Sequence, residues 1–167
     1  MERLEGHVLN TLRFEQPPAV SVIAREMLEA VKVMHDHDWR HRDIKPDNVT
    51  LTTDGKIKFL DFGIAAPIGE GEMLGTPNFA AEEVFPILRV SESAALFSPP
   101  IKGAPELVEQ ERNAVLRFFR QYETVDIYGV GATAKFLCPK CGEDSDFKEF
   151  LELTMNVHPW NRPTAAS

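Results

Sequence analysis

The stretch between His41 and Gly63 constrains the fold more than any other part of the chain. Within it, apolar residues alternate with threonine and lysine in two short runs, which is the period-two pattern of half-buried strands. The pair Asp54-Gly55 separates the runs, and such a pair supplies the positive φ angles of a tight hairpin turn. The sequence therefore predicts an antiparallel hairpin over residues 49–60.

Polar side chains mark the open end of this hairpin. Asn48 precedes the first predicted strand and Asp61 follows the second, so both are expected at the same end. Adjacent strands lie about 4.8 Å apart, and oxygen ligands at that spacing suit a hard cation such as Mg²⁺. Asp43 and Lys45 lead into this end and add a carboxylate and a positive charge suited to phosphate. The layout predicts phosphoryl transfer.

Two motifs around the hairpin resemble those of the eukaryotic protein kinases. The first resembles the kinase catalytic loop, and the second resembles the metal-binding triplet of that family. In this chain they are His41-Arg42-Asp43 followed by Asn48, and Asp61-Phe62-Gly63. The order Asp-Ile-Lys-Pro-Asp-Asn over residues 43–48 is similar to the serine/threonine branch.

The resemblance implies roles for four residues. Asp43 would accept or orient the proton of the substrate hydroxyl, and Lys45 would contact the transferred phosphate. Asn48 and Asp61 would hold Mg²⁺, and the implied cofactors are therefore ATP and Mg²⁺.

Other residues match supporting parts of the same family. The resemblance implies that Glu83 pairs with Arg162, that Asp126 braces the catalytic loop, and that His41 is structural. The residues assigned to the activation and peptide-docking loop are Arg42, Phe62, Gly63 and Thr76.

The segment from Ile64 to Gly75 contains no Ser, Thr or Tyr. The arginine before the catalytic aspartate of such kinases commonly binds a phosphate on this segment, and here no hydroxyl is available for one. Either Glu70 or Glu72 takes the place of that phosphate as a permanent anionic partner of Arg42, or both glutamates are simply solvated.

The predicted fold class is α+β and mainly α-helical, a kinase-like C-lobe in which a small β-hairpin carries the catalytic and metal-binding loops. An apolar stripe between Val20 and Met34 predicts a core helix, after which His35 and His37 are expected to be solvated. Residues 145–156 predict a second, shorter helix. We expect residues 1–167 to be a partial kinase domain without an N-lobe, with residues 84–124 as an atypical insertion that includes a helix over 105–122.

The chain has two cysteines, in the sequence Cys138-Pro139-Lys140-Cys141. This spacing resembles one knuckle of a zinc site, but a structural zinc site needs four ligands. Two reduced thiols are expected, and a zinc ion shared between two chains is the alternative.

Charge and hydropathy narrow the class of partner. The formal net charge of −8 argues against nucleic acid, because phosphate contacts need clustered lysine and arginine. Residues 1–16 show no signal peptide, and no run approaches the roughly 18 apolar residues of a membrane span. We expect a soluble cytoplasmic or nuclear protein that binds a protein substrate or partner, with no nucleic-acid or membrane partner.

Two functions remain open at this point. In the first, the chain is the catalytic half of a serine/threonine kinase that transfers phosphate from ATP·Mg²⁺ to protein hydroxyls once an N-lobe completes it. In the second, it is a pseudokinase or kinase-derived binding module without catalysis. No G-x-G-x-x-G occurs in the chain, and Thr50 stands at the position of the usual leucine beneath adenine. Both departures favour the second function, whereas Asp43, Asn48 and Asp61 favour the first.

Overall fold

The computed structural model describes residues 5–68, 70, 74–85 and 124–165. Most of the predicted insertion at 84–124, including its predicted helix, lies outside these residues. The strands are β1 (Gly6–Val8), β2 (Trp39–Arg40), β3 (Val49–Thr52), β4 (Ile57–Phe59) and β5 (Ala66–Pro67). The helices are α1 (Pro17–His35), α4 (Thr124–Leu137) and α5 (Ser145–Thr154), with 3₁₀ turns η1 (Leu9–Thr11), η2 (Pro46–Asn48), η3 (Glu82–Val84), η5 (Cys141–Glu143) and η6 (Pro159–Asn161).

The predicted hairpin is confirmed. Strands β3 and β4 pair antiparallel, with Val49 opposite Phe59, and Gly55 in the turn has a φ of 80°. Strand β1 pairs antiparallel with the other edge of β3, which gives the order β1-β3-β4. A separate two-stranded sheet joins β2 to β5, antiparallel. The pairing of β2 with β5 brings the residues before the catalytic motif beside those after Gly63.

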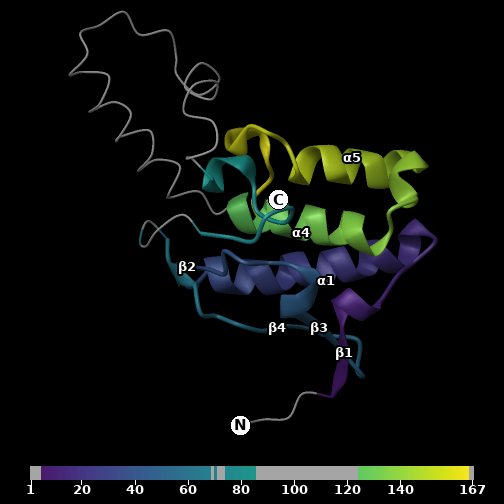
Figure 1. Cartoon of the computed structure of the whole chain (residues 1–167), viewed down its shortest axis with the longest axis horizontal. Coiled ribbons are helices and arrows are strands. Elements are labelled where there is room, and N and C mark those ends of the chain that lie inside the picture. The colour runs from purple at the N-terminus through teal and green to yellow at the C-terminus, as the bar shows by residue number, and fades with distance from the viewer. Residues whose placement is uncertain (1–4, 69, 71–73, 86–123, 166–167) are drawn as a thin grey trace, which may run out of the picture.

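The three helices of the described part stack in layers, with α4 between α1 and α5 (Figure 1). Helix α1 follows the predicted apolar stripe, and its buried residues include Val20, Ile23, Met27 and Val31. These side chains face both α4 and the hairpin, because α1 contacts α4 and β4. The hairpin that carries the catalytic motif is therefore seated on the apolar face of α1.

Helix α4 is buried on almost every side, and two glycines make its close packing possible. A Cβ atom on Gly129 would lie 2.9 Å from the backbone oxygen of Ile44, in the catalytic loop. A Cβ atom on Gly131 would lie 2.3 Å from the hydroxyl of Thr154, at the end of α5. Any side chain at these positions would push the helix away from the loop or from α5, since interiors are close-packed.

The 3₁₀ turn η3, which contains Glu83, is held by a buried ion pair. The guanidinium of Arg162 donates hydrogen bonds to both carboxylate oxygens of Glu83, one of them at 3.1 Å, and its Nε donates to the carbonyl of Asn156 at 2.7 Å. The two side chains are 0% and 5% exposed. Because each charge is desolvated, each depends on the other for compensation.

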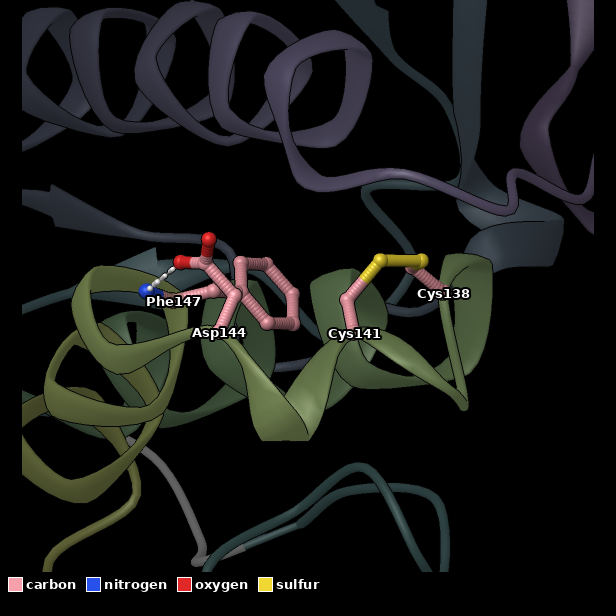
Figure 2. Close-up of a disulfide and its surroundings, with 4 residues drawn as sticks. All are labelled: Cys138, Cys141, Asp144 and Phe147. Atoms are coloured by element: carbon pink, nitrogen blue, oxygen red, sulfur yellow. Dashed lines mark hydrogen bonds between the residues drawn. A yellow bond between two sulfur atoms is a disulfide. The ribbon is translucent and has the colours of Figure 1, made fainter.

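The expectation of two free thiols was wrong. A disulfide joins Cys138 and Cys141 just beyond the end of α4 (Figure 2). The turn between the cysteines brings their Cα atoms to 5.4 Å, which is within the range that a disulfide spans. The spacing of the two cysteines in the sequence does not fix the distance between their Cα atoms, so it could not predict the bond.

Replacing Glu83 by Gln should destabilise the fold strongly, because the charge of Arg162 would stay buried without its partner. The expected loss of unfolding free energy is about 3–5 kcal/mol, measured by urea unfolding followed by circular dichroism. Glu152 provides a matched control, since its ion pair with Lys148 is 64–68% exposed. Glu152→Gln should change stability by less than about 1 kcal/mol. Equal effects of the two substitutions would contradict the assigned role of the Glu83 pair.

Candidate active site

Asp43 lies at the centre of a compact polar cluster between β2 and β3. Its Oδ2 accepts from Lys45 Nζ at 2.8 Å and from Asn48 Nδ2 at 2.9 Å. Its Oδ1 accepts from the hydroxyl of Thr76 at 2.6 Å, and that hydroxyl in turn accepts from Lys45 at 2.8 Å. Three residues from two separate segments thus fix the orientation of one carboxylate.

These contacts also set the charge of Asp43. Burial raises the pKa of its carboxyl group, but hydrogen bonds from Lys45, Thr76 and Asn48, together with the charge of Lys45, lower it by more. The net pKa lies below the ordinary value, so the group is ionised at neutral pH. An ionised, fixed carboxylate is suited to accept a hydrogen bond from a hydroxyl and to orient it.

Asp126, at the start of α4, fixes the backbone of the catalytic motif by accepting two hydrogen bonds from it. Its Oδ2 accepts from the amide of His41 at 2.9 Å, and its Oδ1 accepts from the amide of Arg42 at 2.7 Å. Arg42 has a φ of 69°, a left-handed conformation that is costly for a residue with a side chain. The two amide hydrogen bonds to a carboxylate that is only 1% exposed hold this conformation in place.

His35 differs from expectation, because it is buried rather than solvated. It is 7% exposed, and its Nε2 lies 3.0 Å from Oδ2 of Asp126. The sequence does carry a signal for this burial, since His35 continues the apolar series of Met27 and Val31 at intervals of four residues. His37, by contrast, is exposed as expected.

His41 is enclosed rather than available for chemistry. Its side chain is 0% exposed, and its Nε2 lies 3.0 Å from the carbonyl of Leu60. The ring centroid lies 5.1 Å from the rings of both Phe59 and Phe62. His41 therefore links the catalytic loop to the end of β4, next to the Asp61-Phe62-Gly63 triplet.

The structure brings Asn48 and Asp61 to the same end of the hairpin. The amide of Leu60 donates to the carbonyl of Asn48 at 2.8 Å, which places Asp61 directly beside the start of β3. The side chain of Asp61 is exposed, and one of its oxygens accepts from the amide of Gly63 at 3.2 Å. In the described part of the chain, no group of three or more His, Cys, Asp or Glu residues could hold a metal ion. One amide and one carboxylate oxygen nevertheless suit Mg²⁺, which commonly takes few protein ligands and completes its shell with phosphates and water.

Several contacts anchor the segment after Gly63 to the strand before the catalytic motif. The amide of Ile68 donates to the carbonyl of Asp38 at 2.7 Å, and the Nε of Arg42 donates to the carbonyl of Ile64. Arg40 is 1% exposed, and its Nη2 donates to the carbonyl of Glu70 at 3.4 Å. Glu72, the other glutamate considered as a partner of Arg42, lies outside the described residues. The contact between Arg40 and the carbonyl of Glu70 was not predicted from the sequence.

A further contact that sequence reasoning missed joins the start of the chain to the catalytic loop. Asn10 donates from its side chain to Oδ1 of Asp47 at 2.7 Å. No local pattern signals this pair, because 37 residues separate its members.

Removing one hydrogen bond from Asp43 should raise the pKa of its carboxyl group. In Thr76→Val the donor is lost, so the pKa is expected to move up towards the ordinary value of about 3.9. A lowered folded-state pKa contributes stability above about pH 4 that is lost as the pH falls through the folded pKa, and the variant should have less of this stability. Carboxyl-detected NMR titration measures the shift. Thr53→Val, at an exposed position, is the control and should leave the pKa of Asp43 unchanged.

Replacing Asp126 by Asn should release the catalytic motif. The amide nitrogen of Asn cannot accept a hydrogen bond, so one backbone N–H of His41 or Arg42 would be left without its acceptor. The expected cost is about 1–3 kcal/mol of unfolding free energy, with faster hydrogen exchange at those two amides. Unchanged exchange at both amides would show that Asp126 does not hold the motif.

Comparisons with known proteins bear on this site. A family model described as the protein kinase domain matches residues 1–167. The serine/threonine-protein kinase SMU1 of Mycosarcoma maydis is 32% identical over 99% of this chain and 23% of its own length. The kinase ste20 of Emericella nidulans is 29% identical over 99% of this chain and 20% of its own length. The serine/threonine-protein kinase pak-1 of Caenorhabditis elegans is 30% identical over 99% of this chain and 30% of its own length.

The chain thus spans between a fifth and a third of the length of these relatives. No helix in the described part of the chain is long and apolar enough to cross a membrane. The family model covers every residue of the chain, including His41-Arg42-Asp43, Asp61-Phe62-Gly63 and the Glu83–Arg162 pair. The chain belongs to the protein kinase family.

Proposed function

We propose that this chain provides the catalytic half of a serine/threonine protein kinase, which transfers the terminal phosphate of ATP to hydroxyl groups of proteins. The observation that carries the proposal is the cluster around Asp43. Lys45, Thr76 and Asn48 hold its carboxylate ionised and in one orientation. Phosphoryl transfer depends mainly on positioning and on charge stabilisation, and this cluster supplies a part of each.

Asp43 would orient the hydroxyl group of the substrate. Lys45 lies within hydrogen-bonding distance of both Asp43 and Thr76, so its ammonium group stands beside the place where that hydroxyl would lie. Its positive charge would attract the phosphate that moves towards the hydroxyl. The amide side chain of Asn48, which donates to Asp43, would keep the carboxylate turned towards the substrate.

The open end of the hairpin fits ATP·Mg²⁺. Asn48 and Asp61 would hold the metal ion through oxygen atoms, a donor set that suits Mg²⁺ together with phosphate oxygens. The bound ion supplies neutralisation of the charge on the phosphates. The exposed carboxylate of Asp61 is available for this contact, and its hydrogen bond to the amide of Gly63 orients it.

The relatives, which are serine/threonine-protein kinases, support a protein hydroxyl as the substrate. A small pocket opens beside Asp43 and Thr76, and Phe79, Ala80 and Val84 contribute apolar walls to it. Because the Glu83–Arg162 pair fixes η3, the pocket has a defined shape. The pocket has room for only about one water molecule, so it does not itself hold a peptide side chain.

Binding without catalysis is the second candidate, and Thr50 favours it. This residue is 5% exposed in β3, where a polar hydroxyl takes the position of the leucine that usually lies beneath adenine. The glycine-rich loop and the lysine that align the ATP phosphates in this family also have no counterpart in the 167 residues. Catalysis therefore requires that these groups come from additional polypeptide.

The deciding experiment measures phosphate transfer by the native protein that contains this chain, at the length found in cells. Labelled ATP, Mg²⁺ and a mixture of serine- and threonine-containing peptides serve as substrates. Asp43→Asn should lower kcat by about 10²–10⁴-fold, because the substrate hydroxyl loses its acceptor. Asp54→Asn, in the exposed hairpin turn, is the matched control and should retain full activity.

Two outcomes would overturn the proposal. Equal activity of the wild type and Asp43→Asn would show that this carboxylate is not catalytic. Absence of any transfer by the wild type, together with retained binding of a partner protein, would establish the binding module instead.

A further inference from the structure

The corner between α4 and α5 contains a covalent link that phosphoryl transfer does not use. Cys138 directly follows the last residue of α4, and Cys141 begins η5. The disulfide between them closes the short loop Cys-Pro-Lys-Cys. The two cysteines are 1% and 3% exposed, and both belong to the main hydrophobic cluster.

The disulfide lies at the start of a series of hydrogen bonds that continues into α5. The amide of Cys141 donates to the carbonyl of Cys138 at 3.1 Å, and the amide of Asp144 donates to the carbonyl of Cys141 at 3.1 Å. Asp144 then caps α5, because its Oδ1 accepts from the amide of Phe147 at 2.9 Å. Figure 2 shows Asp144 and the ring of Phe147 beside the disulfide. The position of the first turn of α5 therefore depends on how the two cysteines are held.

We propose that Cys138 and Cys141 form a reversible redox switch, in which reduction by a dithiol loosens the corner between α4 and α5. Two separate thiols need more room than a bonded pair of sulfur atoms. Both cysteines are enclosed, and Phe147, at 3% exposure, packs in the same cluster. A close-packed interior does not absorb such a change without movement, so the corner must open when the bond is broken.

Two features make the change reversible and local. Pro139 and Lys140, which separate the cysteines, are both exposed, so the loop can open towards solvent while α4 keeps its core contacts. Only two residues separate the thiols after reduction, so they stay close together and the bond can form again at a small entropic cost.

Reduction proceeds by thiol–disulfide exchange. Because the cysteines are 1% and 3% exposed, the exposed loop through Pro139 and Lys140 must open before a thiolate of the dithiol reaches a cysteine sulfur. The thiolate then attacks that sulfur, the disulfide bond breaks, and the other cysteine leaves as a thiolate that takes up a proton. The second thiolate of the reductant then attacks the mixed disulfide, which releases the remaining cysteine and forms a disulfide within the reductant. The protein gains two electrons and two protons, and the dithiol is oxidised.

Hydrogen exchange of the native full-length protein, followed by mass spectrometry, tests the proposal. Oxidised protein is compared with protein treated with dithiothreitol, and then with the same protein after reoxidation. Amides at the start of α5, Phe147 and Lys148, should exchange at least tenfold faster after reduction and should recover after reoxidation. Amides in the middle of α1, residues 23–31, should keep their rates. The double variant Cys138→Ser/Cys141→Ser should show no response to dithiothreitol.

Each contrary result would overturn the proposal. Two free thiols in the native protein, shown by alkylation and intact mass, would mean that the bond does not form. Bound zinc that protects these thiols would assign the pair to a metal site. Equal hydrogen-exchange rates at the start of α5 with and without reductant would show that the corner does not respond to the bond. An acceleration in α1 equal to that in α5 would show that the bond stabilises the whole fold. These comparisons use the wild-type protein, so they stand even if the double variant does not fold.

Discussion

The carboxylate of Asp126 is the contact on which the candidate site depends. It is almost fully buried at the start of α4, and it accepts hydrogen bonds from two consecutive backbone amides of the catalytic motif. Those bonds hold Arg42 in a left-handed conformation and so direct Asp43 towards Lys45 and Thr76. His35 approaches the same carboxylate from the end of α1. One side chain thereby joins two helices to the catalytic loop, and a buried acceptor with several donors tolerates little change.

Helix α4 extends this constraint across the fold. The absence of a side chain on Gly129 lets the catalytic loop approach the helix, and Gly131, about half a turn later and so on the opposite side, does the same for α5. The helix then ends at the disulfide, so its two ends carry the catalytic brace and the redox-sensitive corner. The buried Glu83–Arg162 pair fixes η3, and the guanidinium of Arg162 lies 5.0 Å from the ring centroid of Tyr128 in α4. The proposed chemistry and the proposed switch are separate, but both rely on the rigid placement of α4.

The sequence predicted the elements that depend on neighbouring residues. The alternating pattern and the Asp54-Gly55 turn were sufficient for the hairpin, and an antiparallel hairpin necessarily places Asn48 and Asp61 at one end. The apolar stripe of α1 could also be predicted, because it depends only on the spacing of residues within that helix. For His35 and Asn10 the sequence analysis failed because the deciding partner is distant, whereas the two cysteines are only three positions apart. His35 is buried against a carboxylate that lies 91 residues away in the sequence, and Asn10 donates a hydrogen bond to Asp47, which is 37 residues away. The state of the cysteines depends on a turn geometry that their spacing alone does not fix.

The sequence by itself therefore determined the family, the hairpin and the kinds of side chain at its open end, because periodicity, turn chemistry and motif spacing are properties of adjacent residues. The tertiary structure decided which of those side chains meet and in what state. It placed Lys45 and the hydroxyl of Thr76 against Asp43, and their hydrogen bonds lower the pKa of that carboxyl group. It also enclosed Arg40, His35 and the two cysteines. Burial and long-range contact follow from how helices and sheets pack on one another, and that packing is specified by the whole chain at once.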